Sequence, residues 1–525
     1  MSAVASRFVV PTSLSLREKI AQLIFVRVGS NMPPVKTVEQ DEERALRLLE
    51  ECPVGGLLLF NGGPDAKQSL AKLQAVSKIP LLVGSDIERG VGQQVKGYTL
   101  FPHSMAFGRG KAGIGLFMEA LVREARDVGI HIVFGPVADI NTNPRNPIIS
   151  IRAFSETVDR AAELVADYVR MAEETDLLTT AKHFPGHGDT FQDSHDSLPA
   201  LDLSLDELHE RELLPFQAAI DAGCSLIMTA HIAFPQIDPS GLPATLSRTI
   251  LVDLLRDEMG YEGVVCSDSL LMAGVRDQFA TEGELALAAL NAGVDVLLDF
   301  EDPIAVIEHL LRAHQSGELD DARIDEALKR VLALKKKIFG RPPVPLPLPK
   351  GMPSTASACD LFSEVAEQAA RDAVEVVDLH RAILPLDPGA ATAVILLKPF
   401  ETAIEPPEQP LGAVAREGFR NAKYVQLGPR ADESAYRSAR EAAAEAKQVV
   451  IAIIVRPAAW HAYGLRPEQV EFVRGLIAER KGVVLASLGA PYPLDDFPEA
   501  AVRICTYSDV PVSQQALVEF LLAET

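Results

Sequence analysis

Short hydrophobic runs alternate with stretches of helical periodicity over the first 340 residues, and this alternation is the strongest constraint on the fold. Eight runs rich in β-branched residues and leucine lie at 24–28, 55–60, 80–84, 131–135, 177–181, 225–230, 263–267 and 295–299. Helical spacing of apolar residues recurs between them, for example at 41–51, 66–76, 116–128, 160–174 and 205–222. Because neighbouring parallel strands need a crossover, the pattern predicts a parallel sheet. Eight such units favour a closed (β/α)8 TIM-type barrel, with an open sheet as the alternative.

A proline-rich stretch follows this region. Residues 341–349 read Arg-Pro-Pro-Val-Pro-Leu-Pro-Leu-Pro, and alternating prolines favour an extended, semi-rigid linker. Strand-like runs reappear at 393–397, 449–455 and 482–487, with helical stretches between them. We therefore predict a barrel domain over residues 1–340, a linker over 341–354 and a smaller α/β sandwich domain over 355–525.

Composition and charge narrow the class of protein. The 525 residues are 47% hydrophobic, and 50 basic against 73 acidic side chains give a formal charge of −23. Such a surface repels phosphate backbones and anionic lipids, so neither nucleic acid nor a membrane is an expected partner. The N-terminus lacks the pattern of a secretory signal. Five scattered cysteines without a CxxC pair indicate buried thiols in a reducing compartment. We expect a cytoplasmic enzyme.

Titratable side chains follow five successive predicted strands. These residues are Asp86, Asp139, Lys182 with His183, His231 and Asp268. Active sites of (β/α)8 barrels lie at the carboxyl ends of the strands, where these side chains would meet. One polar residue at such a position is common on any solvated rim, but five strands in succession indicate a functional site.

Three of the residues suggest proton transfer or nucleophilic chemistry. Asp268 follows a buried run, so its carboxylate would be either an ion-pair partner or a nucleophile. Asp193 and His195 are two residues apart and would project to one side of an extended loop, where the carboxylate would orient the imidazole. A local surface contact is the alternative. A metal site that adds His183 and His187 is disfavoured, because the intervening glycines and proline give no zinc-type spacing.

One apparent cofactor motif does not fit its context. Residues 108–113 match GxGxxG, but no convincing strand precedes them and no acidic residue lies at a strand end about 20 positions further on. The motif is interpreted as a loop that leads into a helix, and no dinucleotide is expected.

The segment 182–190, Lys-His-Phe-Pro-Gly-His-Gly-Asp-Thr, followed by Asp-Ser-His at 193–195, resembles glycoside hydrolase family 3. Within that family it is similar to the β-N-acetylhexosaminidase branch. Supporting matches lie at 146–149, 152–154, 228–231, 243–247 and 263–268. Residues 487–492 resemble the C-terminal domain of two-domain members, so the resemblance covers nearly the whole chain.

The resemblance implies a retaining glycosidase without metal or organic cofactor. Asp268 would be the nucleophile, and His195, held by Asp193, would be the general acid/base in place of the usual second carboxylate. Five further residues match positions that bind sugar hydroxyls: Asp86, Asp139, Arg152, Lys182 and His183. The implied substrate is a terminal β-linked N-acetylglucosamine, as in cell-wall fragments, and the implied assembly is a monomer or homodimer.

One departure from the family pattern affects the expected sugar. Gln94 stands where the branch usually has an arginine, and an uncharged amide makes weaker hydrogen bonds to a sugar. A β-glucosidase therefore stays open as an alternative. So does a phosphorylase, because a histidine acid/base does not repel an incoming phosphate. The non-enzyme alternative is a catalytically inactive sugar-binding protein.

Overall fold

The computed structural model describes residues 13–110, 113–191, 198–346, 358–402 and 405–523. The chain forms two compact units. The first comprises Met1–Thr99, Ile114–Thr142 and Glu156–Asp360, and the second comprises Leu100–Gly113, Asn143–Ser155 and Leu361–Thr525. The units differ from the contiguous division predicted from the sequence, because two segments within the first 340 residues group with the second unit.

Eight parallel strands close into a barrel in the first unit, which confirms the predicted fold class. The strands are β1 (Ile24–Val28), β2 (Gly56–Leu59), β3 (Leu82–Ser85), β4 (Ile132–Val133), β5 (Leu178–Phe184), β6 (Leu226–Thr229), β7 (Val264–Ser269) and β8 (Val296–Leu298). Most of their residues are buried, as expected for strands that have side chains in the barrel interior and helices on the outside.

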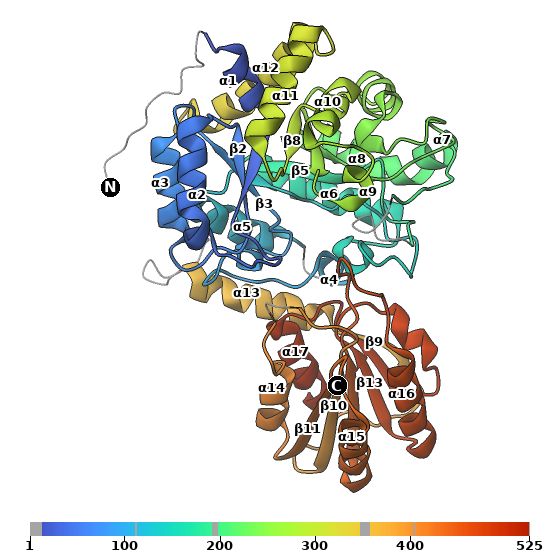
Figure 1. The fold of residues 1–525 in the computed structure, drawn as a ribbon. Coiled ribbons are helices and arrows are strands. Elements are labelled where there is room, and N and C mark those ends of the chain that lie inside the picture. The colour runs from blue at the N-terminus through green and yellow to red at the C-terminus, as the bar shows by residue number, and fades with distance from the viewer. Residues whose placement is uncertain (1–12, 111–112, 192–197, 347–357, 403–404, 524–525) are drawn as a thin grey trace. The chain divides into compact units, whose positions relative to one another are not determined.

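Amphipathic helices cover the outside of the barrel. They include α1 (Leu16–Ala21), α2 (Val38–Glu51), α3 (Ala66–Val76), α5 (Gly115–Val128), α6 (Val158–Glu173), α8 (Leu213–Asp221), η5 (Thr249–Glu258), α10 (Glu282–Ala292), α11 (Pro303–Ser316) and α12 (Asp321–Phe339). Helix α2 illustrates why they form: Thr37 and Gln40 make a capping box at its start, and Val38, Ala45 and Leu48 form a buried stripe. Helices α2 and α3 lie side by side outside β2 and β3 (Figure 1).

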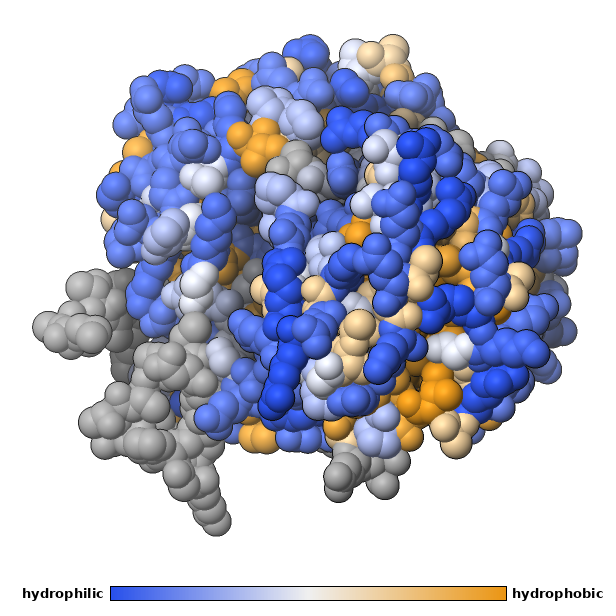
Figure 2. Space-filling view, turned by 90° about the horizontal axis from the view of Figure 1, so that it is seen from below, coloured by the Kyte–Doolittle hydropathy of each residue, from blue (hydrophilic) through white to orange (hydrophobic). Residues whose placement is uncertain are grey.

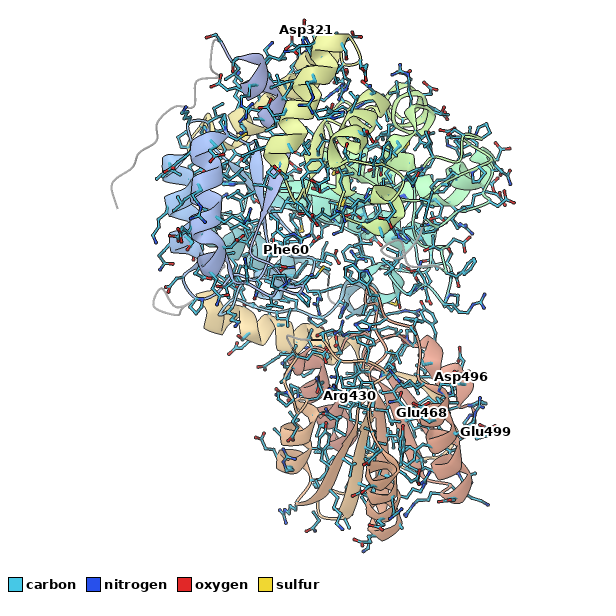
Figure 3. All side chains as sticks on the ribbon, in the orientation of Figure 1. Phe60, Asp321, Arg430, Glu468, Asp496 and Glu499 are labelled. Carbon is cyan, nitrogen blue, oxygen red and sulfur yellow. The ribbon has the colours of Figure 1, made fainter. Side chains whose placement is uncertain are left out.

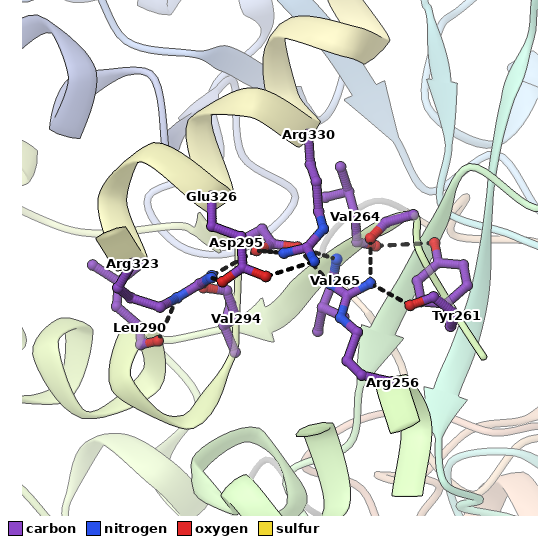
Figure 4. Close-up of polar contacts among 11 residues, drawn as sticks. Arg256, Tyr261, Val264, Val265, Leu290, Val294, Asp295, Arg323, Glu326 and Arg330 are labelled. Carbon is purple, nitrogen blue, oxygen red and sulfur yellow. Dashed lines mark hydrogen bonds and ion pairs between the residues drawn. The ribbon is translucent and has the colours of Figure 1, made fainter. Parts of the chain in front are cut away.

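A buried cluster of charged side chains lies at the N-terminal end of β8 and connects it to two helices (Figure 4). Asp295 is inaccessible to solvent and pairs with Arg256 at 2.7 Å, Arg323 at 2.5 Å and Arg330 at 3.1 Å. Its Oδ2 also accepts the backbone N–H of Val265 at 3.0 Å. The cluster therefore ties β7 and β8 to helices η5 and α12 at the end of the barrel opposite the strand carboxyl ends.

The second unit is built on a six-stranded sheet in the order β11-β10-β12-β13-β14-β9. Its strands are β9 (Glu375–Leu379), β10 (Ala391–Leu397), β11 (Asn421–Leu427), β12 (Gln448–Ile453), β13 (Val483–Ser487) and β14 (Val502–Cys505), and β9 is antiparallel to β14. Its helices are α4 (Ser104–Arg109), α13 (Ala358–Ala373), α14 (Leu411–Gly418), α15 (Glu433–Glu445), α16 (Pro467–Glu479) and α17 (Pro511–Leu522). The sheet with helices on it confirms the predicted α/β domain.

The two early segments of this unit share its hydrophobic core. Met105 and Ile151 belong to one buried cluster with Ile395 of β10 and Ile451 of β12. Gly108 shows how close the packing is, because a Cβ at this position would lie 1.7 Å from the backbone oxygen of Phe154. The glycine of the apparent cofactor motif thus serves backbone packing.

The surface is largely hydrophilic, as expected from the many charged residues in the sequence. Hydrophilic residues cover most of the face in Figure 2, and hydrophobic residues lie in small groups between them. Within the described part of the chain, no helix has both the length and the apolar character that a bilayer span requires. Four of the described cysteines are buried and form no disulfide with one another: Cys52, Cys224, Cys266 and Cys505.

Candidate active site

The carboxyl ends of the barrel strands bring four of the eight predicted residues into two buried clusters. One joins β5 to the segment after β3, and the other joins β5 to the segment after β4. This is the end of a (β/α)8 barrel at which active sites are found.

The first cluster is centred on the Lys182 ammonium. Lys182 belongs to β5, and its side chain is 2% exposed. Its Nζ lies 2.7 Å from Asp86 Oδ1 and 2.6 Å from Glu88 Oε1. The Asp86 side chain is 31% exposed and that of Glu88 only 7%. Lys182 thus pairs with two carboxylates, of which Asp86 is the more accessible.

The second cluster is centred on the Asp139 carboxylate, which is fully buried. It accepts the backbone N–H of His183 at 3.1 Å and that of His187 at 2.8 Å. His183 Nδ1 lies 2.7 Å from Asp139 Oδ2. Because a carboxylate only accepts, Nδ1 carries a proton, and the ring orientation is fixed through this bond. Asp139 therefore holds both His183 and the loop that follows β5.

The loop after β5 packs tightly against the backbone of the segment after β4 at Gly188. A Cβ at Gly188 would lie 1.6 Å from the backbone oxygen of Ile140, so only glycine fits there. His187 Nδ1 lies 2.8 Å from the Thr190 hydroxyl, which also donates to the His187 carbonyl at 3.1 Å. The loop thus leads in a defined path from β5 towards the predicted acid/base segment.

Asp268 lies near the carboxyl end of β7 and is half-buried. Its Oδ1 accepts the backbone N–H of Ser269 at 2.7 Å. Burial and the nearby Asp268 carboxylate raise the pKa of the Cys266 thiol, whereas Lys182 lowers it. Cys266 is therefore a neutral thiol, and Asp268 and Lys182 are both close enough to influence it.

Glu212 lies against the loop that follows β5 and was not among the residues predicted from the sequence. It lies at the end of a short π-helical turn (Leu208–Glu212), is 1% exposed, and contacts Gly186, where a Cβ would lie 3.0 Å from its Oε2. Burial raises the pKa of Glu212 to about 7, Arg211 lowers it and Asp139 raises it. Arg211 donates to Glu212 Oε1 at 2.7 Å, whereas Oε2 has no hydrogen-bond partner among the described residues. No motif marks this glutamate in the sequence.

Besides Asp268, three of the predicted site residues are not placed in these clusters. Asp193 and His195 fall within residues 192–197, outside the described residues. Arg152 is part of the Asn143–Ser155 segment of the second unit, where its guanidinium donates to the Ile148 carbonyl at 3.1 Å. Their roles stay predictions.

Gln94, which replaces the expected arginine, serves as a link between two loops. It is 8% exposed, and its Oε1 accepts from Asn31 Nδ2 at 2.8 Å and from the backbone N–H of Asn61 at 3.3 Å. These bonds join the loops after β1 and β2. The structure thus gives the Gln94 side chain an internal structural role.

Among the described residues, no three His, Cys, Asp or Glu side chains group so as to hold a metal ion. Asp193 and His195 of the candidate metal set lie outside those residues.

The comparisons with known proteins point in one direction. The family model described as the glycosyl hydrolase family 3 N terminal domain matches residues 15–334. β-Hexosaminidase A of Pseudoalteromonas piscicida is 33% identical over 331 residues, which are 55% of this chain and 54% of that protein. A β-N-acetylglucosaminidase/β-glucosidase of Cellulomonas fimi is 30% identical over 362 residues, 67% of this chain and 64% of the relative. The chain thus spans between half and two thirds of the length of these two relatives.

A solved structure resembles the whole chain. It is a glycoside hydrolase family 3 β-N-acetylglucosaminidase from Paenibacillus sp. str. FPU-7, with a TM-score of 0.85 and 29% sequence identity. The likeness covers 97% of both chains, and therefore includes the second unit as well as the barrel.

Proposed function

Because the chain belongs to glycosyl hydrolase family 3, we propose that it is a retaining exo-glycosidase that releases terminal β-linked N-acetylglucosamine. The observation that carries the proposal is the pair of buried clusters around Lys182 and Asp139 at the carboxyl end of the barrel, with Asp268 at the same end. The similarity to β-hexosaminidase A and to the Paenibacillus β-N-acetylglucosaminidase supports the choice of sugar.

The non-reducing sugar would be held by charged hydrogen-bonding groups. Asp86 and His183 would bind hydroxyls directly, and Lys182 would contribute a donor and hold the Asp86 carboxylate through its ion pair. Asp139 would act by fixing the His183 ring. Arg152 is proposed as a further donor to the sugar. Hydrogen bonds to charged groups are worth about 1.5–3 kcal/mol each, which is enough to select one sugar over another.

The reaction would proceed in two steps. A carboxylate oxygen of Asp268 attacks the anomeric carbon, the bond from that carbon to the leaving oxygen breaks, and His195 gives this oxygen its proton. Water then attacks the glycosyl-enzyme, His195 accepts the proton of the water, and the sugar–Asp268 bond breaks. Asp193 would orient the His195 ring and stabilise its charged form. Two displacements at one carbon retain the β-configuration.

The assignment of His195 is tested with leaving groups of different acidity. His195→Ala should fail on natural disaccharides yet keep substantial glycosylation of a dinitrophenyl N-acetyl-β-glucosaminide, because its phenolate departs without a proton. Azide, which needs no general base, should restore the second step. His209→Ala is the matched control, since His209 is partly exposed and pairs with Glu258. Equal losses for good and poor leaving groups, without azide rescue, would mean that His195 is not the acid/base.

Two other activities of the same site remain candidates. The name of the Cellulomonas relative combines N-acetylglucosaminidase and β-glucosidase, so a panel of aryl N-acetylglucosaminide, glucoside and xyloside tests the sugar. A phosphorylase would form the sugar 1-phosphate when phosphate is present. If no sugar 1-phosphate is found among the products, the phosphorylase reaction is excluded. Turnover of any of these glycosides excludes the inactive sugar-binding protein.

A further inference from the structure

The strand that carries Asp268 is irregular where this residue lies. In the ladder between β7 and β8, Cys266 pairs with Val296 and Ser269 pairs with Leu298. Between these two pairs the chain advances by three residues in β7 but by two in β8. The stretch of β7 that contains Ser267 and Asp268 therefore holds one extra residue, which makes it a bulge. A bulge of this kind turns a side chain away from its regular direction and is common beside active sites. It also removes regular ladder bonds, so other contacts must hold the chain.

Two serine side chains supply contacts from the bulge to β8. Ser267 Oγ accepts the backbone N–H of Leu298 at 3.0 Å, in place of a backbone carbonyl. Ser269 Oγ donates to Asp299 Oδ2 at 2.7 Å, immediately beyond the end of β8. Asp268 is thus flanked on both sides by serines that are bonded to the neighbouring strand.

The acceptor of the second serine bond is itself firmly held. The Asp299 side chain is 2% exposed, and Arg27 of β1 pairs with it through Nε at 3.1 Å and through a second, shorter bond from NH2. The Arg27 guanidinium also lies over the ring of Phe60, 4.9 Å from its centre, and Phe60 is labelled in Figure 3. The Asp299 backbone has a φ of 72°, which residues other than glycine rarely adopt. The bonds from Arg27 and Ser269 to its side chain hold it in this conformation.

Ser269 is held from its other neighbour as well. His231, which follows β6, places Nε2 3.0 Å from the Ser269 carbonyl oxygen. Because a carbonyl only accepts, Nε2 carries the proton. His231 Nδ1 lies 2.7 Å from the Thr245 hydroxyl, which fixes the ring. Ser269 is therefore bonded through its side chain towards β8 and through its carbonyl towards β6.

The fixed serine acts on Asp268 through its amide group. The Ser269 N–H donates to Asp268 Oδ1 at 2.7 Å, so the position of Ser269 determines which carboxylate oxygen is engaged and where the other one points. We propose that Ser269 is a positioning residue for the attack of Asp268, held in place by Asp299 on one side and His231 on the other. The inference rests on the proposed function, since it takes Asp268 as the nucleophile.

The size of the effect follows from how sharply such reactions depend on geometry. A misplacement of about 1 Å can reduce the rate of a positioned reaction by about 100-fold. Ser269→Ala removes the bond to Asp299 and leaves the Ser269 amide and the Arg27–Asp299 pair in place. We therefore expect kcat to fall about 10-fold to 100-fold with KM changed less than about twofold, because none of the proposed sugar-binding groups belongs to β7.

The experiment compares Ser269→Ala with two matched variants. Ser269→Thr keeps a hydroxyl and should stay within about threefold of the wild-type kcat, as expected if the hydrogen bond itself matters. Ser225→Ala removes a buried hydroxyl bonded to Glu173 at the opposite end of the barrel, and should leave kcat unchanged. The second readout is the rate at which an activated 5-fluoro glycosyl fluoride labels Asp268, which should fall with kcat in Ser269→Ala alone.

Each outcome has one meaning. Labelling of Asp268 at the wild-type rate in Ser269→Ala, or a raised KM with unchanged kcat, would overturn the positioning role and leave the proposed function standing. Equal losses in Ser269→Ala and Ser269→Thr would also overturn it. If the wild-type enzyme forms no adduct on Asp268, the proposed function fails and the inference fails with it.

Discussion

Replacement of Lys182 by methionine should destabilise the barrel as well as inactivate the enzyme. The Lys182 ammonium lies within 2.7 Å of Asp86 and within 2.6 Å of Glu88, and its side chain is 2% exposed. Breaking a buried ion pair by removing one partner costs about 3–5 kcal/mol, because the remaining charge stays buried. Most of this cost falls on Glu88, which is 7% exposed, since Asp86 is partly solvated.

A second substitution separates stability from activity. Lys182→Met combined with Glu88→Gln removes the buried charge together with its partner, so about half or more of the lost 3–5 kcal/mol should return. Activity should not return, because the donor to the sugar is still missing. The assay is urea unfolding of the barrel alongside kcat/KM for an aryl N-acetylglucosaminide. An unfolding midpoint unchanged by Lys182→Met, or a double variant no more stable than the single one, would refute this account of the cluster.

Two further predictions concern other buried charges. Burial raises the pKa of Glu212 in the folded protein to about 7, against its usual 4.5. As the pH rises, the unfolded chain therefore loses this proton before the folded protein does. The free energy of unfolding of the wild type should fall by up to about 3 kcal/mol between pH 5 and pH 8. Glu212→Gln should remove that part of the decline, and parallel pH profiles of the two urea midpoints would argue against it. Asp295→Asn should cost about 3–5 kcal/mol, because three arginines lose their buried partner. Its kcat at low temperature should match the wild type, since the cluster lies at the other end of the barrel, and a reduced kcat in folded protein would contradict that.

The barrel could be predicted because most of its strands contain a short run rich in apolar or β-branched residues. Strands buried on both faces need such runs, and all eight were found at nearly their observed positions. In the second unit, the central strands β10, β12 and β13 were found for the same reason, whereas β9, β11 and β14 were missed. The residues of β9 and β11 are largely exposed or half-buried, so no apolar run marks these edge strands.

The grouping of Asp86, Asp139 and Lys182 could be anticipated because these residues lie at or beyond the carboxyl-end halves of neighbouring barrel strands. What the sequence could not show is pairing over long separations. Arg27 and Asp299 are 272 residues apart, and neither belongs to a motif. The grouping of Leu100–Gly113 and Asn143–Ser155 with the second unit was missed for the same reason, because it depends on packing against residues about 250 or more positions away.

The central claim, that Asp268 is the nucleophile, is tested most directly by locating a trapped glycosyl group. The protein would be incubated with an activated 5-fluoro glycosyl fluoride of the N-acetylglucosamine series, digested, and sequenced by tandem mass spectrometry. We expect one adduct, on the side chain of Asp268, and none in Asp268→Ala. An adduct on another carboxylate such as Asp86, or continued turnover by Asp268→Ala, would contradict it.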